Sequence, residues 1–169
     1  DARVLTDQYS PSNLLNAIGR HAPHARVIVA GSALVYAASS EPLTESSPVR
    51  PSGAYAVSKL AQEMVALRAA EHDGLDVIVA RSFNHIGPRQ SPAFVASSLA
   101  KQIALIETGR LEPTLAVGNL DPRRDLTDVR DMVRAYRALV ARGTRGLAYN
   151  VCRGEALSVR ELIDALVAR

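Results

Sequence analysis

Hydrophobic positions follow two alternating patterns along the chain. Five segments repeat apolar residues three and four positions apart, the spacing of an amphipathic helix: 12–21, 54–72, 92–109, 128–143 and 158–169. Short continuous apolar runs lie between them, as in strands covered on both faces: 26–32, 75–83, 114–119 and 146–152. Strands separated by helices of this length predict βαβ units around a largely parallel sheet. The expected fold class is therefore α/β.

Residues at the ends of these segments predict where the helices begin and end. Pro11 precedes the first helix, and Ser12 is its expected N-cap. Pro92 suits the first turn of the third helix, and Gly109 suits its end. Ser158 is the expected N-cap of the last helix.

The carboxyl ends of the predicted strands are the expected places for a ligand, because open α/β sheets bind ligands there. Three segments lie at or directly after the carboxyl ends of predicted strands: the Gly-Ser pair at 31–32, the predicted loop "NHIGPRQ" at 84–90, and 119–125. A further segment, 38–53, is rich in Ser, Pro and Glu and is predicted to be a loop.

Composition and charge narrow the class of protein. Hydrophobic residues make up 47% of the chain and charged residues 22%, as in ordinary globular proteins. The net charge of +3 is mild, and the arginines are dispersed with few aromatic residues among them, so nucleic-acid binding is not expected. No apolar run approaches the roughly 18 residues of a membrane span, and the N-terminus has no signal-peptide pattern.

Cysteine and histidine give no sign of disulfide or metal chemistry. Cys152 is the single cysteine and has no partner for an internal disulfide, which fits a reducing, cytoplasmic setting. Its place in the run "LAYNVC" predicts a buried strand residue rather than a nucleophile. The four histidines form no cluster with metal-ligand spacing, so no metal is expected.

The stretch "AYAVSK" at 54–59 places Tyr55 and Lys59 four positions apart, on one face of a helix. A tyrosine is a poor proton donor or acceptor at neutral pH, and a nearby ammonium group favours its phenolate form. Ser32, at the end of the preceding predicted strand, is in the right order to bind the same substrate oxygen. By itself such a Tyr–Lys pair also occurs by chance on ordinary helix surfaces.

Several motifs, taken together in their order along the chain, show a resemblance to a known family that no single motif shows. The segments are "GSALVY", "AYAVSKLAQE", "RSFNHIGPRQSPAFVASSLAKQIA", "VGNLDPRRDLTDVRDMVRAY" and "YNVCRGEALSVREL". Together they cover nearly the whole chain and resemble the extended short-chain dehydrogenase/reductase family of nucleotide-sugar enzymes. The likeness is to its GDP-mannose 4,6-dehydratase and GDP-4-keto-6-deoxymannose reductase branch. It implies a Rossmann-like parallel sheet flanked by helices, with a smaller C-terminal substrate-binding part.

The resemblance also implies roles for particular residues. Tyr55 would be the general acid/base, Lys59 would hold the ribose of NADP or NAD, and Ser32 would complete the catalytic triad. Residues implied to face the cofactor are Asn84 and His85, besides Tyr55 and Lys59. Residues implied to bind the GDP-sugar substrate are Asn84, Arg89, Asn119, Arg124 and Arg160. Arg124 suits a diphosphate because a guanidinium binds phosphate oxygens bidentately. Each of these arginines also has an alternative reading as a solvated surface residue.

One departure from the family pattern favours reduction over dehydration. The dehydratases carry a carboxylate two residues after the triad hydroxyl, as Ser/Thr-x-Glu, to remove the sugar C5 proton. Here that position is Leu34, which cannot move a proton. The expected function is therefore NAD(P)H-dependent reduction of a GDP-4-keto-6-deoxyhexose. A GDP-mannose 4,6-dehydratase, a nucleotide-sugar epimerase and a non-catalytic dimerising fragment remain alternatives.

A second departure concerns the glycine-rich pyrophosphate loop with which the family begins. The sequence contains no G-x-G-x-x-G or G-x-x-G-x-x-G, and family chains are roughly twice as long. The expectation is a truncated chain that binds a dinucleotide weakly alone. Residues 1–90 would hold the triad, and residues 91–169 mainly the nucleotide-sugar site. The resemblance also implies a homodimer formed through helices 12–21 and 54–72.

Overall fold

The computed structural model describes the backbone of residues 2–168 and the side chains of residues 11–168. The chain folds into two compact units that interleave along the sequence. The first unit combines the segment up to Phe83 with Met132–Val151, and the second combines Asn84–Asp131 with the segment from Cys152 onward. The assignment of roles to 1–90 and 91–169 stays a prediction.

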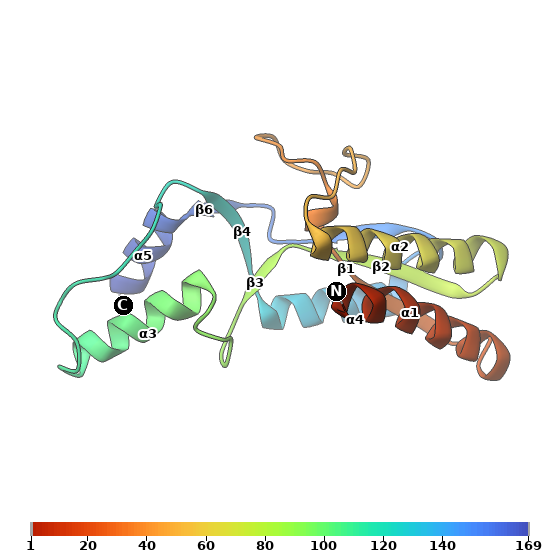
Figure 1. Cartoon of the computed structure of the whole chain (residues 1–169), viewed down its shortest axis with the longest axis horizontal. Helices are drawn as coiled ribbons and strands as arrows, with labels where there is room; N and C mark the ends of the chain where they lie inside the picture. The colour runs from red at the N-terminus through yellow and green to blue at the C-terminus, as the bar shows by residue number, and fades with distance from the viewer. Residues whose placement is uncertain (1, 169) are drawn as a thin grey trace. The chain divides into compact units, whose positions relative to one another are not determined.

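A parallel three-stranded sheet forms the centre of the first unit (Figure 1), in the order β1-β2-β5. Its strands are β1 (Arg26–Ser32), β2 (Asp76–Ser82) and β5 (Ala148–Val151). β2 is the middle strand, and its residues Val77 to Ala80 have no exposed surface. The uninterrupted apolar run of β2 follows from this position, since a central strand covered on both faces has no solvated side.

Helices cover both faces of this sheet. On one face, Leu15 of α1 (Ala2–His21) and Ala66 of α2 (Ala54–His72) belong to a hydrophobic cluster with Val77 and Val79. On the other face, Met132 of α4 (Val129–Arg142) packs with Ala80 and Val151. The first unit is therefore a three-layer α/β arrangement, as the alternating pattern predicted.

The second unit contains a smaller, mixed sheet. β3 (Asn84–Ile86) pairs in parallel with β4 (Arg123–Asp128), and β4 pairs in antiparallel with β6 (Ala156–Ser158). α3 (Val95–Glu107) and α5 (Val159–Val167) contact one another. The predicted cap of α5 is confirmed: Ser158 Oγ accepts from the Glu161 N–H, and the Glu161 carboxylate accepts from the Ser158 N–H.

The predicted strand at 114–119 is wrong. This segment is irregular, and the side-chain amide of Gln102 on α3 forms hydrogen bonds with the backbone of Ala116. Its oxygen accepts from Ala116 N–H at 2.8 Å, and its nitrogen donates to Ala116 C=O at 3.2 Å. A side chain thus satisfies the groups that a neighbouring strand would have bound. The strand lies later, in the charged segment Arg123–Asp128.

Two predicted helix starts are also wrong. α1 begins at Ala2, so Pro11 lies inside it and Ser12 is not its N-cap. Proline has a helix-compatible φ and removes one hydrogen bond, so it does not have to end a helix. α3 begins at Val95 rather than Pro92, because Phe94 N–H donates to Ser91 C=O in a turn that precedes the helix.

Two smaller expectations also differ. The segment 84–90 is not entirely loop, because it begins with β3. Cys152 is exposed rather than buried, since β5 ends at Val151 and the chain leaves the sheet there. Within the described part of the chain, no helix has the length and apolar character needed to cross a membrane.

Candidate active site

Ser32 is the last residue of β1 and is buried, with 7% of its surface exposed. Its Oγ accepts a hydrogen bond of 3.2 Å from the Leu34 N–H and so caps a short 3₁₀ turn, η1 (Ala33–Val35). A hydroxyl that accepts one bond still has its own O–H to donate. Ser32 therefore has a fixed position and a remaining donor at the carboxyl end of the parallel sheet.

α2 carries Tyr55 in its first turn and Lys59 one turn later. The helix begins after Gly53, whose φ of +82° suits glycine and lets the loop turn sharply into the helix. Tyr55 is 54% exposed, and the Lys59 ammonium nitrogen lies 5.8 Å from the centre of its ring. The structure therefore brings these two side chains together as the spacing predicted.

Lys59 also connects α2 to the strand that ends in Ser32. Its Nζ donates to the carbonyl oxygen of Ala30 on β1 at 3.3 Å and to Gln62 Oε1 at 2.9 Å. α2 packs against both β1 and η1. The three candidate catalytic residues thus belong to two directly bonded elements of the first unit.

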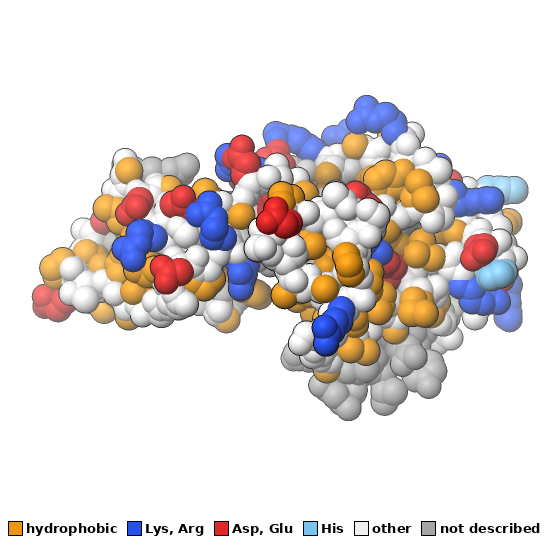
Figure 2. All heavy atoms as spheres, turned by 90° about the horizontal axis from the view of Figure 1, so that it is seen from above, with side chains coloured by type: hydrophobic (Ala, Val, Ile, Leu, Met, Phe, Trp, Pro, Cys, Tyr) orange, Lys and Arg blue, Asp and Glu red, His pale blue; other side chains and the backbone are white. Residues whose placement is uncertain are grey.

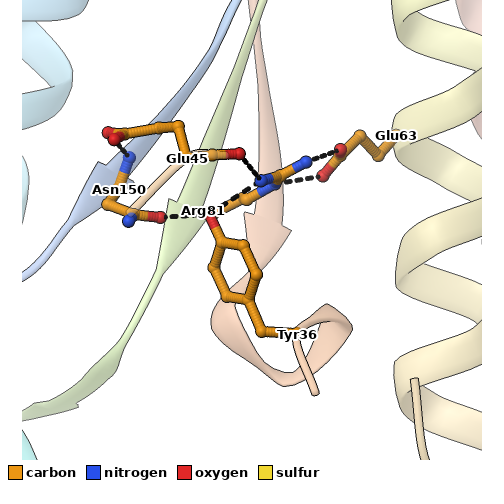
Figure 3. Close-up of polar contacts among 5 residues, drawn as sticks. All are labelled: Tyr36, Glu45, Glu63, Arg81 and Asn150. Carbon is orange, nitrogen blue, oxygen red and sulfur yellow. Dashed lines mark hydrogen bonds and ion pairs between the residues drawn. The ribbon is translucent and has the colours of Figure 1, made fainter. Parts of the chain in front are cut away.

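A buried ion pair joins α2 to the middle strand of the same sheet (Figure 3). Arg81 of β2 and Glu63 of α2 form a bidentate pair, with Arg81 Nε 3.0 Å from Glu63 Oε2 and a second bond between Nη2 and Oε1. Their side chains are 8% and 3% exposed. Removal of one partner from such a buried pair costs about 3–5 kcal/mol, because the other charge is left without compensation.

The same guanidinium reaches the segment that follows Ser32. Arg81 Nη1 donates to the Tyr36 hydroxyl at 2.7 Å and to the Glu45 carbonyl oxygen at 3.1 Å. The Tyr36 hydroxyl in turn donates to Asn150 Oδ1 at 2.7 Å, as Figure 3 shows. The Glu45 carboxylate accepts from the Asn150 N–H. The loop 38–53 is therefore bonded to two strands of the sheet.

The pKa values of these groups follow from burial and bonding. Burial raises the pKa of the Tyr36 phenol above its ordinary value, although the hydrogen bond from Arg81 acts in the opposite direction. Hydrogen bonding to Glu63 raises the pKa of the Arg81 guanidinium. Tyr36 is accordingly a neutral phenol at neutral pH and is able to donate to Asn150.

Three of the sequence-predicted site residues lie on β3 and the turn after it, in the second unit. Asn84 and His85 belong to β3 and are exposed, and the Gln90 amide donates to His85 C=O at 2.9 Å. Arg89 has a φ of +71°, which is uncommon for a residue other than glycine. Such backbone strain concentrates at functional sites, so the conformation of Arg89 is consistent with a functional turn.

The remaining predicted site residues lie near the start of α5 in the second unit: Asn119, Arg124 and Arg160. Arg124 on β4 pairs with Leu157 on β6, which leads directly into α5 and Arg160. The Arg160 N–H donates to Leu120 C=O, so α5 begins beside the segment that contains Asn119. Asn119 lines a cavity of about 330 Å³. Its other walls come from α3, residues 92–93 before it, the segment 116–118 and Val159.

Reasoning from sequence missed the Arg81 cluster, although its signal was present. An arginine inside the apolar run "VIVARSF" is a buried charge, and buried charges need partners. The partners Glu63, Tyr36 and Glu45 come from distant parts of the chain. Among the side chains from residue 11 to 168, no three His, Cys, Asp or Glu residues are grouped in a way that would hold a metal ion.

The surface carries charges of both signs. On the face visible in Figure 2, basic and acidic side chains are interspersed, with exposed hydrophobic side chains between them. The charge of this face is therefore not concentrated in one basic or acidic area.

Comparison with known proteins relates the chain to nucleotide-sugar enzymes. The sequence model of the family described as GDP-mannose 4,6 dehydratase matches residues 3–169. The chain is 41% identical over 157 residues to the GDP-6-deoxy-D-mannose reductase of Pseudomonas aeruginosa, a match that covers 91% of this chain and 52% of the reductase. It is 33% identical over 165 residues to the dTDP-glucose 4,6-dehydratase of Streptomyces griseus, covering 97% and 48%.

Solved structures agree with these relationships. The structure of RMD from Pseudomonas aeruginosa complexed with NADPH is similar with a TM-score of 0.91 at 39% identity, covering 96% of this chain and 56% of that one. DesIV, a dTDP-glucose 4,6-dehydratase from Streptomyces venezuelae with NAD bound, has a TM-score of 0.82 at 29% identity, covering 98% and 50%. The chain therefore spans about half the length of the relatives it matches.

Proposed function

Because the chain belongs to the GDP-mannose 4,6 dehydratase family of NAD(P)-dependent nucleotide-sugar enzymes, we propose that the protein reduces a GDP-linked 4-keto-6-deoxyhexose. The product would carry a hydroxyl group at C4 of the sugar. The reductase among its relatives, at 41% identity, supports this choice over dehydration.

Leu34 is the observation that carries the proposal. It follows Ser32 by two residues and is 59% exposed, and its N–H is bonded to the Ser32 hydroxyl. Dehydration needs a base at this position to remove the C5 proton, and an apolar side chain has no group that accepts one. Reduction of a ketone needs a proton donor at the C4 oxygen and no base at C5. The residues at the end of β1 therefore suit reduction.

Three residues of the first unit perform the chemistry in this proposal. A bound nicotinamide cofactor supplies the hydride. Tyr55 donates a proton to the C4 oxygen as the carbonyl becomes an alcohol. Ser32 donates a hydrogen bond to the same oxygen and stabilises the negative charge that develops on it. Lys59 stabilises the tyrosinate left after proton transfer, since its ammonium nitrogen lies 5.8 Å from the Tyr55 ring centre.

The residues of this chain fit one end of such a cofactor. Lys59 Nζ uses two of its three N–H groups, on Ala30 and Gln62, which leaves one for a ribose hydroxyl. Tyr55 is half exposed beside it, and Asn84 and His85 are exposed on β3. The sequence has no glycine-rich loop for the pyrophosphate. Lys59 and Tyr55 would hold NADP or NAD at its nicotinamide ribose, and weak dinucleotide binding by these 169 residues alone is expected.

The second unit would bind the GDP part of the substrate. Arg124 and Arg160 are exposed guanidinium groups near the start of α5, and guanidinium groups bind phosphate oxygens bidentately. Asn119 lines the nearby cavity, whose volume of about 330 Å³ falls in the range of small-molecule sites. Arg89 and Asn84 would contact the sugar from β3 and its following turn.

An assay of the protein expressed from the complete reading frame that contains this sequence tests the proposal. The substrates are GDP-4-keto-6-deoxymannose and, separately, GDP-mannose, each with NADPH or NADH. The expected result is reduction of the keto sugar, no conversion of GDP-mannose, and loss of turnover in Tyr55→Phe. Tyr149→Phe is the matched control, because it removes a phenol from β5 of the same unit.

Each other outcome would replace the proposal by one of its alternatives. Dehydration of GDP-mannose would mean that another residue removes the C5 proton and that the protein is a dehydratase. Interconversion of sugar epimers would indicate an epimerase. No turnover of any nucleotide sugar would favour a non-catalytic, dimerising protein.

A homodimer through α1 and α2 is part of the same proposal. The two helices pack against one another, and large apolar side chains remain exposed on them: Leu14, Val57 and Met64. Sedimentation of the protein, compared with a Val57→Glu and Met64→Glu double variant, tests it. A dimer that the two charges convert to a monomer is expected. A wild-type monomer would contradict it.

A further inference from the structure

The Arg81 guanidinium is bonded to the segment after Ser32, to the loop before Tyr55 and to the helix that carries Tyr55 and Lys59. Tyr36 follows Ser32 by four residues, and Glu63 follows Lys59 by four. Glu45 contributes its backbone carbonyl from the intervening loop. Through the Arg81 side chain, the segment that follows Ser32 is thus connected to the helix that carries Tyr55 and Lys59. Figure 3 shows the bonds of Arg81 to Tyr36 and Glu63.

The register of the sheet brings this side chain close to the site. Arg81 lies opposite Gly31, and its neighbour Ser82 lies opposite Ser32. On α2, Lys59 and Glu63 share one helix face, and both are bonded to the sheet: Lys59 to Ala30 on β1, and Glu63 to Arg81 on β2. The helix is therefore attached to the sheet at two successive turns, directly after the turn that contains Tyr55.

We propose that Arg81 is a positioning residue whose fork of bonds to Glu63 and Tyr36 sets the placement of Ser32 relative to Tyr55 and Lys59. This inference rests on the proposed reductase activity. Arg81 touches neither substrate nor cofactor in it, and acts through Tyr36 and Glu63. Its five N–H donors in a fixed plane let one group hold two partners in defined directions.

The choice of residues supports a role in placement rather than in stability alone. A buried ion pair is often no more stabilising than apolar residues of the same volume, because both charges lose their hydration. Apolar packing, however, has no preferred direction, whereas a bidentate pair fixes the orientation of both partners. The Tyr36 hydroxyl continues this series of directional bonds, since it accepts from Arg81 and donates to Asn150.

The double variant Arg81→Met/Glu63→Leu tests the proposal, because it removes both charges together and leaves neither buried without a partner. The expected result is a folded protein whose kcat for keto-sugar reduction falls about 10- to 100-fold, the usual effect of a small misplacement of catalytic groups. Turnover is expressed per folded molecule, from circular dichroism and from the fraction that binds NADPH. The KM for the sugar should change less than about threefold, because the arginines proposed to bind it are elsewhere.

Three further variants separate placement from stability. Arg68→Met removes an exposed pair between α2 and its C-cap residue Asp73, and should leave kcat unchanged. Tyr36→Phe removes the hydroxyl but keeps the ring beside the guanidinium, which lies 4.8 Å from its centre, so a smaller decrease in kcat is expected. Arg81→Lys keeps the charge without the fork. It should therefore fail to rescue turnover.

Hydrogen exchange gives a readout that does not depend on activity. In the double variant, amides at 54–59 and in the loop 38–53 should exchange faster, while those at 64–72 stay protected. Full kcat in the folded double variant, or rescue by Arg81→Lys, would overturn the proposal while leaving the reductase function intact. An inactive wild-type protein would refute the function instead. Unchanged exchange at 38–59 would then overturn the positioning role as well.

Discussion

The ammonium nitrogen of Lys59 lies 5.8 Å from the centre of the Tyr55 ring, one turn further along α2. The same nitrogen is bonded to Ala30, two residues before Ser32 on β1. A single lysine therefore lies between the proposed proton donor and the strand of the proposed oxygen-binding serine. We expect both its charge beside Tyr55 and its hydrogen bond to β1 to affect the proposed proton transfer.

Lys59→Met should lower kcat for keto-sugar reduction at least about 100-fold, because proton transfer loses the nearby charge and α2 loses a bond to β1. Lys101→Met is the matched control: it changes the only other lysine of the chain, which is exposed on α3. Steady-state kinetics with saturating cofactor measure both. Equal kcat in the two variants would show that Lys59 is an ordinary surface lysine.

Leu34→Glu should introduce a base where the dehydratases have one. In D₂O, with the GDP-4-keto-6-deoxy sugar as substrate, the variant is expected to exchange the C5 proton for deuterium, and the wild-type protein is expected not to exchange it. Mass spectrometry of the recovered sugar measures the exchange. Leu34→Gln has nearly the same shape as the glutamate variant and no basic carboxylate, so it serves as control. Exchange by the wild-type protein would contradict the role assigned to Leu34.

The capping box of α5 should make stability depend on pH. The Ser158 N–H, together with the Ser158 side chain and Arg123, holds the pKa of Glu161 below its ordinary value of 4.5. A carboxylate whose pKa is lower in the folded state stabilises above about pH 4.5, and this contribution is lost as the pH falls through the folded value. Glu161→Gln should therefore flatten the decline of the unfolding free energy below that pH.

Thermal unfolding of the Glu161→Gln variant measures this pH dependence between about pH 2 and about pH 7, the range over which carboxylates titrate. Glu155→Gln removes another exposed carboxylate of the second unit, one that pairs with Arg153, and controls for the loss of a surface charge. An unchanged slope in Glu161→Gln would mean that the cap has no effect on stability in acid.

Gly143→Ala should destabilise the first unit by about 1–3 kcal/mol, as overpacking does in a close-packed interior. A Cβ at this position would lie 2.6 Å from Ile78 Cδ1 and 2.7 Å from the Leu139 carbonyl oxygen. At Gly19 on α1 the closest atom would be 3.8 Å away, so Gly19→Ala is expected to be neutral or stabilising. Urea unfolding compares the two variants, and equal midpoints would contradict the packing at Gly143.

Hydrophobic periodicity determined most of the elements of the first unit. The predicted ranges 26–32 and 54–72 coincide with β1 and α2, and 75–83 contains β2. In these elements burial and backbone conformation require the same residues, so a local pattern is sufficient. The facing of Tyr55 and Lys59 followed in the same way from the period of the helix.

The second unit was harder to predict because its strands are not apolar. β4 has the sequence "RRDLTD" and is bonded to β3 and β6 through its backbone, which every sequence can supply. The apolar segment 114–119 was predicted as a strand in its place, yet its Ala116 is bonded to the Gln102 side chain. Strand pairing depends on which backbone groups remain without a partner, and that is a property of the assembled unit.

The sequence by itself determined where the proposed catalytic tyrosine, lysine and serine lie in the order of elements. Only the tertiary structure decided what holds them. Arg81 was visible as a charge in an apolar run, but its partners Glu63, Tyr36 and Glu45 are 18, 45 and 36 residues away. Local patterns reflect interactions within a few residues, whereas the pairing of a buried charge depends on every element that packs around it.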